Sequence, residues 1–376
     1  MSKNGKQKLR VGVIFGGRSG EHEVSLNSAQ SVMRALNPDK YEVIPIGIDK
    51  DGRWLTGDVV GTLTEGKSSS QHATLLPDPQ ASGLMQLNEG ENVGITAVSQ
   101  LDVIFPVLHG PYGEDGTVQG LLELANLPYV GAGVVGSAVG MDKAIFKHVM
   151  VANGLPVLPW LLVQSSDWRK RPYKVIEQIE AILVYPVFTK PANLGSSVGI
   201  SKCNNREELE AGLNEAASYD RRVVVEQGAN VRELEVSVLG NEDPVASVVG
   251  EVRPLRDFYD YVAKYVSDDS ELIIPADLTE AESDEVRRLA VQAYKAIDCA
   301  GLGRVDLLLD VEHGRLYLNE INTIPGFTRI SMYPKLWEAS GLPYSQLLDK
   351  LIELAIERHE EKEQLKTTYK STDDAD

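Results

Sequence analysis

The stretch from Arg304 to Ser331 constrains this chain most, because it predicts a β-hairpin with polar side chains gathered at one end. Two apolar runs flank a polar turn that contains Gly314, a pattern typical of a hairpin. Asp306 lies near the start of the first run, and Glu320 and Asn322 end the second. Alternate side chains of a strand share a face, so Glu320 and Asn322 point the same way, and the hairpin brings Asp306 beside them.

These two carboxylates and one amide oxygen predict a site for Mg²⁺, a hard cation that oxygen ligands hold and that itself holds substrate phosphates. Pro325-Gly326 ends the second strand just beyond the cluster and can turn a backbone N–H toward it. The alternative is a hairpin with ordinary solvated acids, because short carboxylate spacings also arise by chance.

Composition narrows the class of protein. A chain of 376 residues predicts two or three domains. The net charge of −18, with no basic stripe, argues against a nucleic-acid or anionic-membrane partner, and no apolar run approaches the roughly 20 residues of a membrane span. Cys203 and Cys299 have no C-x-x-C spacing and predict reduced thiols in a cytoplasmic protein. The charged end, residues 363–376, predicts a disordered tail.

The N-terminal segment predicts an anion-binding loop. A strand at 9–15 precedes the glycine loop 16–20 and a helix, so backbone N–H groups and the helix dipole point at the loop. A nicotinamide-cofactor site is the alternative, but G-x-G-x-x-G is absent and Asp49 comes too late for the ribose acid. Glu21 opens the helix, where the dipole also favours its charge for structural reasons alone.

Two later strands end in candidate site residues. The buried strand 101–108 ends in His109, which is a site candidate because functional loops follow the carboxyl ends of strands, although a structural hydrogen bond fits equally well. The strand 186–191 contains Lys190 and leads into the small-residue loop 192–199, which suits a lid over phosphates but also an ordinary turn. Residues 57–100 predict loops and weak strands.

Further segments predict two helices and a second lid. A helix at 137–151 carries Lys143 near its start, and a last helix runs from about 344 to 358. The long tyrosine-rich connection 254–270 predicts another lid, since long loops in compact domains are usually lids or disordered and aromatics argue against disorder.

Seven motifs occur in order along the chain: GGRSGEHEVS at 16–25, HGPYGEDG at 109–116, MDK at 141–143, KPANLGSSVG at 190–199, FYDYVAKY at 258–265, GRVD at 303–306 and NEINTIPGFT at 319–328. Each is weak evidence alone, and together they are highly specific. From Val11 to about Leu354 the chain resembles the D-alanine–D-alanine ligases of the ATP-grasp superfamily.

The resemblance implies an α/β (α+β) ATP-grasp fold with three subdomains. An N-terminal doubly wound α/β substrate-binding domain would span 1–136, and a central subdomain with the Gly-Ser lid 137–226. A C-terminal subdomain with the metal site would span 227–362, and ATP would be clasped between the last two. The implied reaction makes an acyl phosphate from one D-alanine and ATP, which the amine of a second D-alanine then attacks. A homodimer is implied by the family alone.

The resemblance also assigns ligands for ATP and metal. Two Mg²⁺ (or Mn²⁺) ions would be held by Asp306, Glu320 and Asn322. Contacts to ATP are implied for Lys143, Lys190, Ser196, Glu226, Glu233, Lys264 and Asn319. The segment 227–232 varies in length within the family, so Glu235 is an alternative to Glu233 for the ribose.

Substrate roles follow in the same way. Glu21 is implied to hold the ammonium of the first D-alanine, with His109 also in this substrate site, and Ser331 to bind the carboxylate of the second. Arg304 and the N–H of Gly326 are implied to hold the tetrahedral oxyanion.

A hydrogen-bonded triad is implied between Glu21, Ser196 and Tyr265, and it would link the first domain to both lids. Tyr265 fits dipeptide formation, whereas relatives that make D-alanyl-D-lactate differ in this loop. His22 stands where some members carry arginine, so its role is open. The competing functions are a ligase of this superfamily for another D-amino or D-hydroxy acid, an NAD-dependent dehydrogenase and a non-catalytic nucleotide-binding module.

Overall fold

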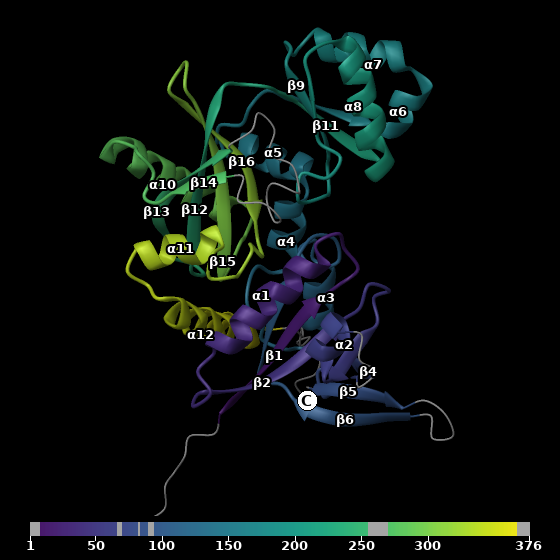
Figure 1. Ribbon diagram of the computed structural model, residues 1–376, viewed down its shortest axis with the longest axis vertical. Coiled ribbons are helices and arrows are strands. Elements are labelled where there is room, and N and C mark those ends of the chain that lie inside the picture. Colours follow the sequence, from purple (N-terminus) through teal and green to yellow (C-terminus); the bar gives the residue numbers. More distant parts are fainter. Residues whose placement is uncertain (1–7, 66–69, 82, 89–93, 255–269, 367–376) are drawn as a thin grey trace, which may run out of the picture.

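The computed structural model describes residues 8–65, 70–81, 83–88, 94–254 and 270–366. It contains three β-sheets: seven strands at one end of the long axis, then sheets of five and four strands side by side at the other (Figure 1). The first sheet lies within residues 9–108, the four-stranded sheet within 160–227 and the five-stranded sheet within 231–322. The subdomain boundaries at 136, 226 and 362 stay a prediction.

The first sheet is built on three parallel strands, β2 (Tyr41–Ile48), β1 (Leu9–Gly16) and β7 (Val103–Leu108), in that order. Alternate residues of β1 and β7 are buried on opposite faces. One face packs on α1 (His22–Ala35) and the other on α3 (Thr117–Leu124), which explains why both strands are apolar throughout.

The sequence between β2 and β7 is more regular than predicted. Residues 59–65 form helix α2 (Val59–Glu65), so the expectation of loops and weak strands was wrong there. Four strands extend the sheet in antiparallel fashion: β3 (Trp54–Gly57), β4 (Ser70–Leu75), β5 (Gly83–Asn88) and β6 (Gly94–Gln100).

The helix predicted at 137–151 is two helices, α4 (Val134–Met141) and α5 (Lys143–Ala152). Asp142 breaks it, because its extended backbone lets its carboxylate accept the N–H of Ile145 at 3.0 Å as an N-cap. The break lets α5 start anew at Lys143, whose side chain lines the large cavity described below.

The four-stranded sheet has the order β10-β9-β11-β8 and is antiparallel. Its strands are β8 (Trp160–Gln164), β9 (Val187–Pro191), β10 (Ser201–Cys203) and β11 (Arg222–Gln227). Three helices complete this part: α6 (Ser165–Lys170), α7 (Pro172–Glu180) and α8 (Arg206–Tyr219). They share one core with a single face of the sheet, while apolar residues of the other face pack against α5 through Ala144.

The five-stranded sheet has the order β14-β13-β12-β15-β16. Its strands are β12 (Val231–Leu239), β13 (Val245–Pro254), β14 (Ser270–Ile273), β15 (Leu302–Asp310) and β16 (Arg315–Asn322). The helices of this part are α10 (Glu280–Ala296), α11 (Met332–Ala339) and α12 (Tyr344–Glu363). The predicted hairpin is confirmed as β15 and β16, with Gly314 in the turn at a φ of 63°.

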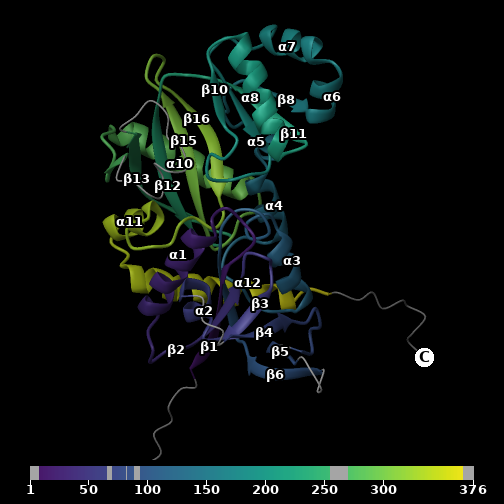
Figure 2. The same cartoon turned by 45° about the vertical axis from the view of Figure 1, so that its right-hand side comes forward.

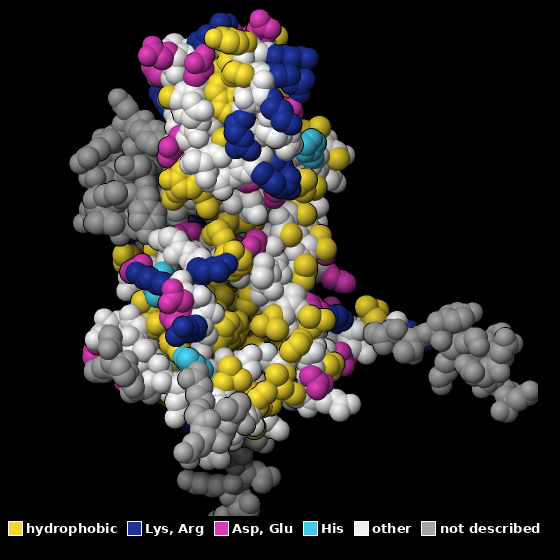
Figure 3. All heavy atoms as spheres, turned by 90° about the vertical axis from the view of Figure 1, so that its right-hand side faces the viewer, with side chains coloured by type: hydrophobic (Ala, Val, Ile, Leu, Met, Phe, Trp, Pro, Cys, Tyr) yellow, Lys and Arg dark blue, Asp and Glu magenta, His cyan; other side chains and the backbone are white. Residues whose placement is uncertain are grey.

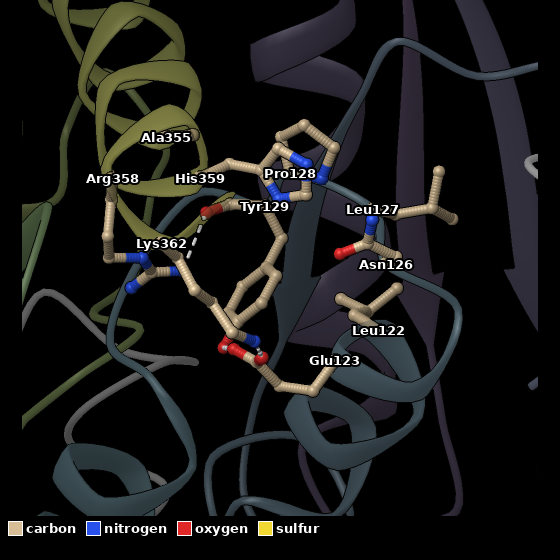
Figure 4. A pocket seen from close by; sticks show the side chains of 10 residues that line it. All are labelled: Leu122, Glu123, Asn126, Leu127, Pro128, Tyr129, Ala355, Arg358, His359 and Lys362. Carbon is tan, nitrogen blue, oxygen red and sulfur yellow. Dashed lines mark hydrogen bonds and ion pairs between the residues drawn. The ribbon is translucent and has the colours of Figure 1, made fainter. Parts of the chain in front are cut away.

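Helix α12 ties the end of the chain to the first sheet, and both views place it there (Figures 1 and 2). The Arg358 guanidinium donates to the backbone carbonyls of Tyr129 and Gly131 and lies 4.4 Å above the Tyr129 ring, while Lys362 pairs with Glu123 (Figure 4). The cavity of about 20 Å³ between them has room for about one water. The contact of α12 with residues 123–131 therefore holds the seven-stranded and five-stranded parts of the chain together.

Three further features concern the surface charge, the character of the helices and the C-terminal end of the chain. On the face in Figure 3, Lys and Arg side chains lie among acidic and apolar ones. Across the described ranges, no helix combines the length and the apolar character that crossing a membrane requires. Helix α12 ends at Glu363, and the rest of the predicted tail from 367 on lies outside the described residues.

Candidate active site

A cavity of about 810 Å³ lies where the loops of the first sheet meet the β15–β16 hairpin and helix α5. Its lining combines residues that are far apart in sequence, and many were candidates from the sequence. Those candidates are Glu21, His109, Lys143, Ser196, Glu233, Arg304, Asp306, Asn319, Glu320, Asn322, Gly326 and Ser331. The volume falls within the range of small-molecule sites, which is about 300–1,000 Å³.

The hairpin forms what we call the acid wall: Arg304, Asp306, Glu320 and Asn322. Apolar residues of β15 alternate toward the core beneath α10, which leaves Arg304 and Asp306 on the cavity side. Strand pairing sets Asp306 opposite Glu320 and Arg304 opposite Asn322, with a register shift after Asp306.

Cationic groups balance both acids of this wall. The Arg304 guanidinium donates twice to the Asp306 carboxylate, at 2.7 Å each, and also reaches Glu235 at 3.0 Å. The Lys143 ammonium lies 3.4 Å from the Glu320 carboxylate. Such bidentate arginine–carboxylate pairs fix both side chains in geometry as well as charge.

The acid wall also has the donor chemistry for a hard cation. The Asn322 amide Nδ2 donates to the Asp306 carboxylate at 3.0 Å, and strand pairing sets Glu320 opposite Asp306, so the two carboxylates and the amide lie together. Among the residues that the structure describes, no group of three or more His, Cys, Asp or Glu side chains is arranged to hold a metal ion. By ligand type alone the set of Asp306, Glu320 and Asn322 fits Mg²⁺, and an ion there would compete with the Arg304 and Lys143 contacts.

Helix α5 and the four-stranded sheet together form what we call the lysine wall: Lys147, Lys190 and Glu226. None of the three is among the residues that line the cavity. Strand register places Lys190 on β9 and Glu226 on β11 on one face of the sheet. One oxygen of the Glu226 carboxylate pairs with Lys147 and the other with Lys190. Burial opposes the charge on Glu226, but the two lysines outweigh it and lower its pKa to about 2.

Lys147 was not a candidate from the sequence. Its signal was present, since it follows Lys143 by four residues and so lies on the same face of α5. A lone lysine in a helix is usually solvated, and only the fold shows that this one is buried.

The loop after β9 reaches across to the first domain. The Lys143 ammonium donates to the backbone carbonyl of Leu194 at 2.7 Å, and the Ser196 hydroxyl donates to the Glu21 carboxylate. A Cβ atom on Gly195 would lie 3.1 Å from a Glu21 oxygen, so a small residue is needed at this approach. The structure thus brings two members of the predicted triad together, whereas Tyr265 and Lys264 lie outside the described residues.

His109 occupies a buried position behind the substrate candidates. Its Nδ1 lies 2.9 Å from the carbonyl of Ile324, so Nδ1 carries the proton, and its Nε2 lies 3.4 Å from the Ser28 hydroxyl. Burial lowers its pKa, which favours the neutral ring. His109 therefore links the first domain to the loop after β16.

Glu114 is a second residue that sequence reasoning left without a role, although its motif was noted. It lines the cavity and accepts the N–H of Gly110 at 2.7 Å. Burial, together with the nearby charge of Glu21, raises its pKa to about 8, so Glu114 is protonated at neutral pH. His22, whose role was open, lies 2.8 Å from the carbonyl of Gly17 through Nδ1 and so braces the glycine loop.

The remaining candidates line the same cavity at its far side. Ser331 precedes α11, and its hydroxyl accepts the N–H of Thr328 at 3.1 Å. Gly326 is close to this hydroxyl, since a Cβ atom there would lie 3.2 Å from it. Glu233 and Glu235 both line the cavity, so the choice between them for a ribose contact stays a prediction.

Comparison with known proteins adds independent findings. Residues 10–132 match the family model "D-ala D-ala ligase N-terminus", and residues 149–353 match "D-ala D-ala ligase C-terminus". A D-alanine–D-alanine ligase from Heliobacterium modesticaldum is 52% identical over 358 residues, which cover 95% of this chain and 97% of that one.

Two solved structures resemble the fold closely. A D-Ala:D-Ser ligase from Enterococcus faecalis has a TM-score of 0.82 and 36% identity, and the match covers 93% of this chain and 100% of that one. A D-alanine–D-alanine ligase from Coxiella burnetii has a TM-score of 0.78 and 37% identity, with 95% and 96% coverage.

Proposed function

The chain belongs to the D-alanine–D-alanine ligase family, with its ATP-grasp fold, and on this premise we propose that it joins two D-alanine molecules at the expense of ATP. The product, D-alanyl-D-alanine, serves peptidoglycan synthesis. The observation that carries the proposal is the single cavity of about 810 Å³ that an acid wall, Lys143, Glu21 and Ser196 share. An ATP-dependent ligase needs cationic side chains for the phosphates and anionic side chains for the metal ion and the substrate ammonium, all within one cavity.

The first step joins two anions, so it needs positive charge. A carboxylate oxygen of the first D-alanine attacks the γ-phosphorus of ATP, the bond to the β-phosphate oxygen breaks, and ADP leaves. Lys143 and Lys190 offset the phosphate charge and hold the reacting groups together. Mg²⁺ or Mn²⁺, held by Asp306, Glu320 and Asn322, would neutralise further phosphate charge when bound.

The second step forms the peptide bond. The amine of the second D-alanine, after losing a proton, attacks the carbonyl carbon of the acyl phosphate, and inorganic phosphate leaves. The Arg304 guanidinium and the N–H of Gly326 hold the oxyanion that develops, while Ser331 binds the carboxylate of the second substrate. Glu21 holds the ammonium of the first substrate, and its bond with Ser196 couples that site to closure of the loop 192–199.

A second candidate differs only in the acceptor. The likeness to the D-Ala:D-Ser ligase from Enterococcus faecalis favours D-serine as an alternative second substrate. Tyr265, the residue on which the choice between dipeptide and depsipeptide products rested, lies outside the described residues, so a substrate assay decides the matter.

The deciding experiment measures ADP release with ATP and Mg²⁺. D-Alanine alone should support steady release, and L-alanine should not. Adding D-serine or D-lactate at limiting D-alanine tests the acceptor through the mass of the product. Absence of D-alanine-dependent ADP release would refute the proposed function, and a mixed product with D-serine in preference to D-alanine would establish the second candidate.

We also propose a homodimer, on the strength of the family resemblance alone. Light scattering on the purified chain tests it, since a monomer has a mass of 41.1 kDa. A single species near that mass at assay concentration would refute the dimer.

A further inference from the structure

Lys147 is the most deeply buried charged side chain of the lysine wall, with 1% of its side chain exposed. It extends from α5 to Oε1 of Glu226, while Lys190 occupies Oε2 of the same carboxylate. Neither the family motifs quoted above nor the cavity lining include Lys147. Its role in the proposed reaction is therefore unassigned.

The three charges do not cancel. Two ammonium groups share one carboxylate, so the buried trio carries one excess positive charge when all three are ionised. Burying charges costs several kcal/mol per ion, and a well-packed apolar pair of similar volume often stabilises a protein as well or better. Anchoring of α5 to β11 alone is therefore a poor explanation for a second buried lysine.

Glu320 offsets part of the excess charge, since it acts on both lysines of the trio, and an anionic ligand beside the trio accounts for the rest. Lys190 is the trio's partly exposed member, at 14% of its side chain. It does not itself line the cavity, but Glu320 and Glu233, which do, act on its charge, so Lys190 is the member of the trio on the cavity side. Lys143, one helical turn before Lys147, already lies in the cavity beside Glu320 and the loop carbonyl of Leu194. Helix α5 thus presents one lysine to the cavity and a second to the carboxylate behind it.

We propose that Lys147 is a positioning residue for the nucleotide: by holding Oε1 of Glu226 it fixes Oε2 on Lys190, and so sets both side chains where ATP contacts them. The inference rests on the proposed function, in which Glu226 and Lys190 contact ATP. Lys147 itself does not touch the ligand. Without it, the Glu226 carboxylate is free to rotate and Lys190 follows it.

The protonation states agree with this arrangement. Burial lowers the pKa of Lys147 despite the attraction of Glu226, and repulsion from Lys190 lowers it further. For Lys190, burial is outweighed by Glu226, and the more distant Glu320 and Glu233 also help to raise its pKa. Burial thus outweighs the nearby carboxylates for Lys147 and is outweighed by them for Lys190.

The test replaces Lys147 with Met, which keeps the length of the chain and removes the charge. Loss of one charge-assisted contact should weaken ADP binding, measured by calorimetry without D-alanine, by about 10-fold or more. The KM for ATP should rise similarly, while the KM for D-alanine stays within about twofold. The matched control is Phe146→Leu, a neighbouring buried residue of α5 that packs into the core with α10 and should lower stability without changing ADP affinity.

Each outcome bears on the proposal. Unchanged ADP affinity in folded Lys147→Met, or equal losses for ATP and D-alanine, would overturn it. If that variant does not fold, Lys147→Gln fills the space with a polar group and should show the same loss of ADP affinity. Failure of both variants to fold would make Lys147 a structural anchor and overturn the proposal. Because ADP binding is measured without turnover, failure of the ligase activity itself would be seen separately in the unmodified chain.

Discussion

The acid wall and the lysine wall both pair carboxylates with cationic side chains, but they differ in how far solvent reaches the carboxylates. On the acid wall the carboxylates of Asp306 and Glu320 are partly exposed, at 14% and 24% of their side chains. Each forms an ion pair with a cationic side chain, Arg304 for Asp306 and Lys143 for Glu320. On the lysine wall Glu226 is only 2% exposed and is enclosed by two lysines. Solvent access therefore leaves the first wall able to exchange its partners for a metal ion, whereas the second keeps its charges fixed.

This difference implies different sensitivities. In the proposed function the acid wall acts on the reacting atoms, so removing one of its charges should impair the chemistry more than the folding. Removing one from the lysine wall disturbs a closed network, so binding and stability should both respond. The following variants test this contrast, from the largest expected effect to the smallest.

Glu320→Gln should reduce turnover by about 10³-fold or more, because it removes a charge where the phosphates and their cation are held. The fold should persist, since Glu320 is partly exposed and Gln has the same shape. Steady-state ADP release and thermal unfolding measure the two effects. Activity close to that of the unmodified chain would show that the acid wall is not the phosphate site.

Arg304→Lys keeps the positive charge but loses the planar fork that donates twice to Asp306. Loss of one oxyanion donor should lower kcat by about 10²–10³-fold, with a smaller change in the KM for ATP. The measurement is a full kinetic profile in both substrates. A variant that loses ATP affinity but keeps kcat would show that Arg304 binds the nucleotide and does not stabilise the oxyanion.

Ser196→Ala removes the hydroxyl that joins the loop 192–199 to Glu21 and touches neither wall. One lost hydrogen bond to a charged group should lower kcat/KM for D-alanine by about 10-fold. Affinity for ADP should stay the same, which distinguishes this variant from Lys147→Met. An equal loss for both ligands would show that the loop serves the nucleotide as much as the amino acid.

Glu114 offers a test of stability instead of activity, because its buried carboxyl has its pKa raised from 4.5 to about 8. A raised pKa in the folded state means that the proton-bound form stabilises the fold most at low pH. This stabilisation is lost as the pH rises from about 4.5 to 8, and above pH 8 the free energy of unfolding no longer changes through this group. The Gln variant has no such proton to lose.

The free energy of unfolding of Glu114→Gln, relative to the unmodified chain, should therefore increase between pH 5 and 8, by up to about 1.4 kcal/mol per pH unit. Urea unfolding at pH 5, 6.5 and 8 measures it. A constant difference across these pH values would show that folding does not raise the pKa of Glu114 into this range.

Local patterns predicted much of the fold. The hairpin at 302–322, the parallel strands around the glycine loop and the strand that ends at His109 all follow from apolar runs that stop at turn residues. Helix α2 was missed because its sequence, VVGTLTE, is rich in β-branched residues that favour strands. The break at Asp142 was missed because the residues on both sides continue a helical pattern, and only the cap hydrogen bond ends one helix and starts the next.

The sequence by itself determined the acid wall, because strand periodicity and one hairpin turn suffice to bring Asp306, Glu320 and Asn322 together. Only the tertiary structure decided the states of Lys147, Glu226 and Glu114. Their charges depend on burial and on partners distant in the sequence, 79 residues away in the case of Lys147 and Glu226. Sequence spacing sets which side chains share one strand or helix face, whereas solvent exclusion and long-range pairing, which fix a buried charge, arise only when separate elements pack.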